Sequence, residues 1–116
     1  MERVEAAVRR AVDLLGGMGA YVRPGQRVLL KPNLVRPAPP ERAVSTHPAV
    51  VAAVARLVAE AGGHAVIVES PGGPYSSGVL RSLYRRTGMD RAAEASGAEL
   101  NEDTSAQQVS LSEGVA

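Results

Sequence analysis

Two short apolar runs with a long helical segment between them constrain the fold of this chain most. Residues 27–30 read Arg-Val-Leu-Leu and residues 64–68 read His-Ala-Val-Ile-Val, and a proline follows closely after each run. Short apolar runs that end in such breakers are typical of strands buried in a parallel sheet. Residues 48–61 lie between them, so the order is strand, helix, strand. We predict a right-handed βαβ unit, because nearly all crossovers between parallel strands have this hand.

The remaining segments add helices and weaker strands to this unit. Apolar residues at helical spacing predict a first helix over residues 2–15, and Gly16-Gly17 ends it. A later helix that contains Leu80 is interrupted at Thr87-Gly88, and a short helix follows over residues 89–95. Weaker strands are expected at residues 98–100 and 108–111. The 116 residues fit one domain, and the predicted class is α/β, a three-layer, Rossmann-like parallel sheet.

The helix between the two strands is unusually apolar. The sequence before Pro48, Ser45-Thr46-His47, is the pattern of a helix start. A proline is tolerated in the first turn because the N–H that it lacks would have no partner within the helix. Past that start the helix carries charges only at Arg56 and Glu60, four residues apart. We therefore expect it to be covered on more than one side.

Composition excludes several classes of function. The chain has no cysteine, so it holds neither a disulfide nor a Cys-ligated iron–sulfur cluster. A formal net charge of +1 gives no general attraction for nucleic acid or for an anionic membrane. The charged amino terminus lacks the apolar run of a secretion signal, and no stretch is long enough to span a membrane. We expect a cytoplasmic protein that binds neither nucleic acid nor membrane.

Polar residues gather where the two predicted strands end. The first strand leads into Lys31 and Asn33, and the second leads into Glu69 and Ser70, with Gly72 in the loop that follows. Ligands of open parallel sheets bind at the carboxyl ends of the strands, where helix amino termini also lie. Lys31 is the only lysine among thirteen basic residues.

This edge is therefore the predicted site. Thr46 and His47, at the start of the crossover helix, should bring free N–H groups to it, and an ammonium beside a helix amino terminus favours a carboxylate or phosphate. We assign Lys31 and Glu69 as candidate catalytic residues. The candidate ligand-binding residues are Asn33, Thr46, His47, Ser70 and Gly72, and no metal ligand is assigned.

Simpler interpretations stand beside this one. Glu69 fits a general base or a metal ligand, but it also fits an ion pair with Lys31 on the neighbouring strand. His47 fits a helix-start residue better than a metal ligand, because no second ligand lies at suitable spacing. The loop at residues 70–73 resembles a phosphate-binding turn only loosely, since it lacks the spacing of the known glycine-rich motifs.

An ordered set of motifs resembles a known family, the domain of unknown function numbered 362. The motifs are Lys31-Pro32-Asn33-Leu34-Val35, Ser45-Thr46-His47-Pro48, Val66-Ile67-Val68-Glu69-Ser70-Pro71-Gly72 and Leu83-Tyr84-Arg85-Arg86-Thr87-Gly88-Met89. The resemblance spans roughly residues 20–100. One departure concerns Glu69, because the family more often has Asp at this position.

The resemblance implies a context rather than a reaction. Members of the family are bacterial and archaeal, and many are named iron–sulfur cluster-binding proteins because they carry a ferredoxin-like module with two 4Fe–4S motifs. The family domain is longer than this chain. The resemblance thus implies that residues 1–116 are the amino-terminal portion of a single, incomplete α/β domain, with the rest of the domain and any 4Fe–4S module elsewhere.

Three functions are compatible with these observations. The first is a redox-linked enzyme domain in which Lys31 and Asn33 hold a small anionic ligand while Glu69 handles a proton or metal. The second is a non-catalytic binding module attached to an electron-transfer domain. The third is a structural half-domain, for which an uncovered apolar face would lead to self-association. The sequence leaves open whether the protein is an enzyme.

Overall fold

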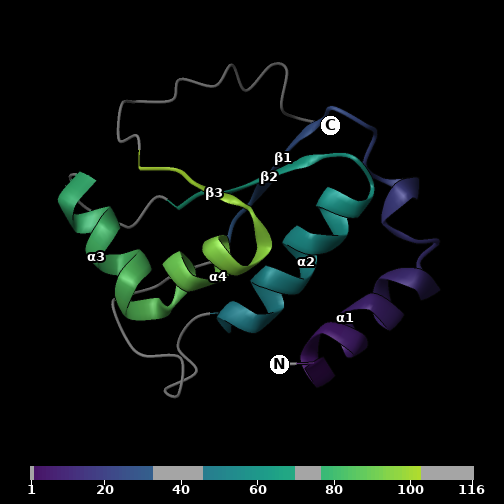
Figure 1. The fold of residues 1–116 in the computed structure, drawn as a ribbon, viewed down its shortest axis with the longest axis horizontal. Helices are drawn as coiled ribbons and strands as arrows, with labels where there is room; N and C mark the ends of the chain where they lie inside the picture. Colours follow the sequence, from purple (N-terminus) through teal and green to yellow (C-terminus); the bar gives the residue numbers. More distant parts are fainter. Residues whose placement is uncertain (1, 33–45, 70–76, 103–116) are drawn as a thin grey trace.

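The computed structural model describes residues 2–32, 46–69 and 77–102. The elements in chain order are α1 (Glu2–Leu14), the short 3-10 helix η1 (Met18–Ala20), β1 (Arg27–Leu30), α2 (Pro48–Glu60), β2 (His64–Ile67), α3 (Ser77–Thr87), α4 (Met89–Ser96) and β3 (Glu99–Leu100). The strands form one open sheet in the order β1-β2-β3, and both pairs are parallel (Figure 1). The predicted α/β class and its Rossmann-like parallel sheet are confirmed. The strand predicted at residues 108–111 lies outside the described residues.

The strands pair in a register that aligns their carboxyl ends. Arg27 of β1 lies opposite His64 of β2, and Leu30 lies opposite Ile67. Ile67 in turn lies opposite Leu100 of β3. Parallel strands in this register bring all of their carboxyl ends to one edge of the sheet, so the segments that follow them share that edge.

The core lies between the sheet and the helices. On β2, Ala65 and Ile67 face the helices, as side chains two apart on a strand share a face. Ile67 belongs to a buried cluster with Val51, Leu80, Leu83, Tyr84, Met89 and Ala93, and Ala65 belongs to a second cluster with Val22, Ala55 and Val58. On the opposite face, Leu29 is 61% exposed, whereas its partner Val66 is fully buried. No helix of the described residues covers that face, and the third layer stays a prediction.

The apolar crossover helix α2 is covered on several sides, as its composition predicts. It packs on the sheet, on α4 and on α1 (Figure 1). Two ion pairs hold α1 against it: Arg9 donates two hydrogen bonds of 2.7 Å to Glu60, and Arg56 pairs with Glu5. The hydrogen bonds from Arg9 lower the pKa of Glu60. Pairs this exposed contribute little stability, so they orient α1 rather than hold it by themselves.

The break between α3 and α4 follows from one residue. Gly88 adopts a left-handed conformation with φ of 82°, which side chains other than glycine rarely adopt. Thr87, which is buried, satisfies its hydroxyl by donating to the Leu83 carbonyl at 2.7 Å. The interruption predicted at Thr87-Gly88 is confirmed, and it turns α4 back across α2.

Gly63, between α2 and β2, is required by packing, and its replacement is the first test of the fold. A Cβ at this position would lie 2.6 Å from Val22 Cγ1, 3.0 Å from Val58 Cγ1 and 3.1 Å from the Gln26 carbonyl oxygen. Gly63→Ala should therefore lower the free energy of unfolding by about 1–3 kcal/mol, measured by urea denaturation. Gly19→Ala is the matched control, because nothing lies within 4 Å of its Cβ. Equal stability of the two variants would contradict this packing.

The start of α2 supplies a second test. His47 is its N-cap, and the Nδ1 atom accepts a hydrogen bond of 3.1 Å from the Ala49 amide. His47→Ala should destabilise the protein by about 1 kcal/mol in urea, because the Ala49 amide loses its partner. His47→Asn, which restores a side-chain acceptor, should recover most of the loss. A failure of asparagine to do so would show that His47 stabilises the protein in some other way.

Candidate functional site

The carboxyl edge of the sheet continues past the ends of the strands. The Val68 amide donates to the Leu30 carbonyl at 2.9 Å, and the Asn101 amide donates to the Ile67 carbonyl at 2.9 Å. These hydrogen bonds extend the register, so that Lys31 is in line with Val68. The segments that leave the three strands therefore lie side by side at this edge, as the candidate site requires.

The start of α2 is tied to the same edge. The Thr46 hydroxyl donates to the Pro32 carbonyl at 2.5 Å, in a half-buried position. Pro32 is buried and directly follows Lys31. The structure thus brings Thr46 and His47 to the segment that carries Lys31, although the Thr46 hydroxyl serves the backbone in this arrangement.

The first turn of α2 has already used most of its amide donors. Pro48 has no N–H, and the Ala49 amide is bonded to His47 Nδ1. The Val50 and Val51 amides donate to the His47 carbonyl at 3.0 and 3.3 Å. Among the described residues, free amides at this end remain only at Thr46 and His47. Of the free N–H groups expected at this helix end, only these two amides remain for a ligand. The helix dipole acts at the same place.

Lys31 and Glu69 lie at the same edge but in different surroundings. Lys31 is exposed, whereas Glu69 is 9% exposed. The alternation that turns Ile67 toward the helices also turns Glu69 toward them, and it turns Lys31, after Leu30, toward the opposite face. Within the described ranges no ion pair joins Lys31 to Glu69. The structure therefore does not show the predicted ion pair between Glu69 and Lys31.

The third strand adds charge that the motifs do not reveal. Glu102, just after β3, pairs with Arg81 of α3 at 3.2 Å. Asn101 accepts a hydrogen bond of 2.8 Å from the Tyr84 hydroxyl through its backbone carbonyl. These contacts join α3 to the end of β3. Pairings between residues so distant in sequence have no local signal, and this explains why sequence reasoning missed them.

Part of the predicted set cannot be placed. Asn33, Ser70 and Gly72 lie outside the described residues. In the part of the chain that the structure describes, no three His, Cys, Asp or Glu side chains gather as a metal site. A Cys-ligated iron–sulfur cluster does not fit this chain, because it has no cysteine to ligate one. No helix of the described residues is long and apolar enough to cross a bilayer.

Sequence reasoning also missed a pocket on the far side of α2. It lies between α1, α2 and α4 and includes Arg56 and Arg91 among its lining residues. Its lining comes from helices far apart in the chain. Three residues of the sequence motifs, His47, Pro48 and Gly88, line the pocket.

Comparison with known proteins supports the resemblance seen in the motifs. A thylakoid-associated protein of Synechocystis sp., sll1697, is 51% identical over 77 residues, which cover 66% of this chain and 24% of that protein. The chain thus spans about a quarter of the length of this curated relative. No solved structure matches the chain. The sequence model of a family described as "Domain of unknown function (DUF362)" matches residues 28–116, and the chain therefore belongs to this family.

Proposed function

We propose that the carboxyl edge of the sheet binds a small anionic ligand, with Lys31 supplying the positive charge. The observation that carries this proposal is the exposed ammonium group of Lys31, which has no ion-pair partner among the described residues. A lysine side chain is a compact, mobile cation that suits a carboxylate or phosphate.

The start of α2 supports the same ligand class. The hydrogen bond between Thr46 and Pro32 holds this helix end against the Lys31 segment. The two amides that remain free there, at Thr46 and His47, are donors that suit an anion, and the dipole adds about 0.3–1 kcal/mol. Asn33, Ser70 and Gly72 remain proposed ligand-binding residues.

Glu69 favours an enzyme as the first version of this proposal. A carboxyl group as buried as Glu69, two residues past β2, suits proton transfer or metal binding at this edge of the sheet. We propose that the domain belongs to a redox-linked enzyme of the bacterial cytoplasm. Any 4Fe–4S cluster would be carried by a separate module with its own cysteines.

The alternative is a non-catalytic binding module attached to an electron-transfer domain. The match to about a quarter of a longer relative favours it, because such a domain can serve as one part of a larger assembly. The relative is described as thylakoid-associated, so attachment to a membrane through other parts of a longer protein agrees with either form.

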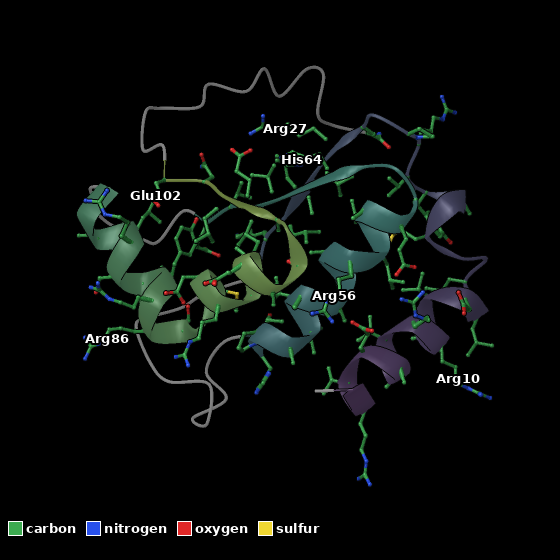
Figure 2. All side chains as sticks on the ribbon, viewed as in Figure 1. Arg10, Arg27, Arg56, His64, Arg86 and Glu102 are labelled. Carbon is green, nitrogen blue, oxygen red and sulfur yellow. The ribbon has the colours of Figure 1, made fainter. Side chains whose placement is uncertain are left out.

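The ligand site is tested by a thermal-shift screen against inorganic phosphate, nucleotides, small carboxylates and divalent metal ions. Phosphate or a carboxylate should raise the melting temperature of the wild-type protein. Lys31→Ala should abolish the shift, because it removes the cation at the edge. Arg10→Ala is the matched control: it removes one positive charge from the exposed face of α1, where Figure 2 shows its side chain directed away from the body of the protein. An equal loss in both variants, or no shift for any compound, would exclude the site.

A variant of Glu69 distinguishes the enzyme from the non-catalytic binding module. Glu69→Gln keeps the size of the side chain and removes its proton acceptor, so the variant should still bind the ligand found in the screen but should not convert it. The measurement is the NMR spectrum of that ligand after incubation with each protein under reducing and oxidising conditions. Recovery of an unaltered ligand from the wild-type protein would favour the binding module.

A further inference from the structure

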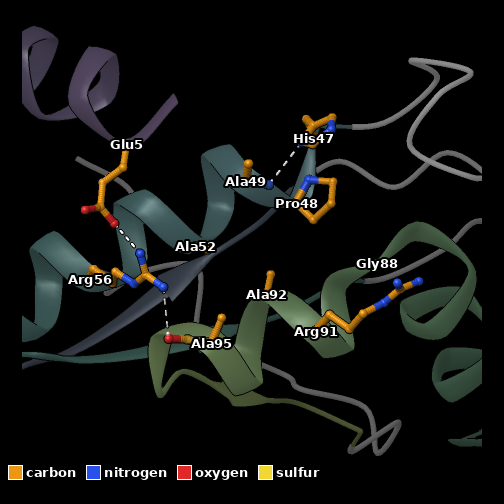
Figure 3. Close-up of a pocket in the computed structure, with 10 residues that line it drawn as sticks. All are labelled: Glu5, His47, Pro48, Ala49, Ala52, Arg56, Gly88, Arg91, Ala92 and Ala95. Carbon is orange, nitrogen blue, oxygen red and sulfur yellow. Dashed lines mark hydrogen bonds and ion pairs between the residues drawn. The ribbon is translucent and has the colours of Figure 1, made fainter. Parts of the chain in front are cut away.

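The helical layer contains a pocket that is separate from the edge of the sheet. Its volume is about 420 Å³, within the range of about 300–1,000 Å³ that is usual for small-molecule sites. Figure 3 shows it bounded by α1, α2 and α4. Lys31 and Glu69 do not line it, so the pocket is not part of the proposed edge site.

Small side chains leave this space open. Four alanines line the pocket, and Figure 3 shows two of them, Ala92 and Ala95, directed from α4 toward α2; the other two are Ala49 and Ala52 of α2. Alanine methyl groups make an apolar wall without filling the volume between the helices. This wall suits a short hydrocarbon group, whose burial contributes about 0.8 kcal/mol per methylene.

The two arginines of the pocket differ in their pairing. Arg56 is neutralised by Glu5 and also donates to the Ala95 carbonyl at 3.3 Å. The Arg91 guanidinium has no ion pair or hydrogen bond with any described residue, and its residue is exposed. The uncompensated positive charge of the pocket is therefore that of Arg91. A guanidinium presents paired N–H donors that match the two oxygens of a carboxylate.

His47 also lines the pocket. Because its Nδ1 atom accepts from the Ala49 amide, the neutral ring carries its hydrogen on Nε2. Figure 3 shows His47 and Pro48 at the end of the pocket away from the pair of Arg56 and Glu5. The pocket thus combines a neutralised end, an apolar wall and an uncompensated cation.

From this arrangement we propose that the pocket binds a small amphipathic carboxylate. The hydrocarbon part lies against the four alanines, and the carboxylate pairs with Arg91. Neither a neutral alcohol nor a purely inorganic anion satisfies both the wall and the guanidinium. The proposal does not depend on the edge site, because the two sets share only His47 at the start of α2.

The test is an NMR titration of the ¹⁵N-labelled chain with hexanoate and, separately, with hexanol. Hexanoate should shift the amide signals of Ala52, Ala92 and Ala95. Arg91→Gln should weaken hexanoate binding roughly ten-fold, the loss of about one charge-assisted hydrogen bond, and should leave the weaker binding of hexanol nearly unchanged. No shift at these alanines in the wild-type protein, or equal affinities of the wild type and Arg91→Gln for hexanoate, would overturn the proposal.

A second variant tests the wall without touching the charge. Ala95→Leu places a larger side chain at the rim of the pocket, in a helix that tolerates leucine, and should reduce the binding of both probes. Ala11→Leu, on the exposed face of α1, is the matched control and should bind both normally. Lys31→Ala should retain the shifts at Ala52 and Ala95. Hexanoate shifts that appear only near Lys31 and vanish in that variant would refute the pocket while supporting the edge site.

Discussion

The arrangement of this protein depends on the burial of one helix. α2 carries only Arg56 and Glu60 as charged residues, so most of its surface must be removed from water. The sheet covers one side, α4 covers another and α1 closes a third. Each buried Val or Leu contributes about 1.5–3 kcal/mol, more than the exposed ion pairs between α1 and α2 supply. The apolar contacts hold the layers together, and the ion pairs decide how α1 is oriented.

The burial of α2 also determines where the polar groups of the candidate site lie. Because α2 crosses back over the sheet, its first turn lies at the carboxyl edge, where the Thr46 hydroxyl reaches Pro32. The His47 ring caps the helix by accepting a hydrogen bond from the Ala49 amide, which is a structural role rather than metal binding. Lys31 is left exposed and Glu69 is buried at this edge. This separation explains why no ion pair joins these two side chains in the described part of the chain.

Two regions with different chemistry therefore meet near the start of α2. The sheet edge presents a lysine ammonium and backbone amides, which suit a compact anion. The pocket between the helices presents an alanine wall and Arg91, which suit an anion with a hydrocarbon part. Membership in a family without an assigned activity leaves the chemistry of these side chains as the guide to function.

Local patterns in the sequence determined the elements of this protein. Apolar spacing and breakers predicted the helices, the strands β1 and β2 and the break at Gly88, because backbone preference and burial act over neighbouring residues. They also predicted that Lys31, Thr46 and Glu69 would come to one edge, since parallel strands must end together. Only the tertiary structure decided the rest: that Glu69 turns inward while Lys31 stays outside, that Arg56 and Glu60 pair with α1, and that four alanines leave a pocket beside Arg91. These features depend on distances between segments far apart in the chain, which no local pattern encodes.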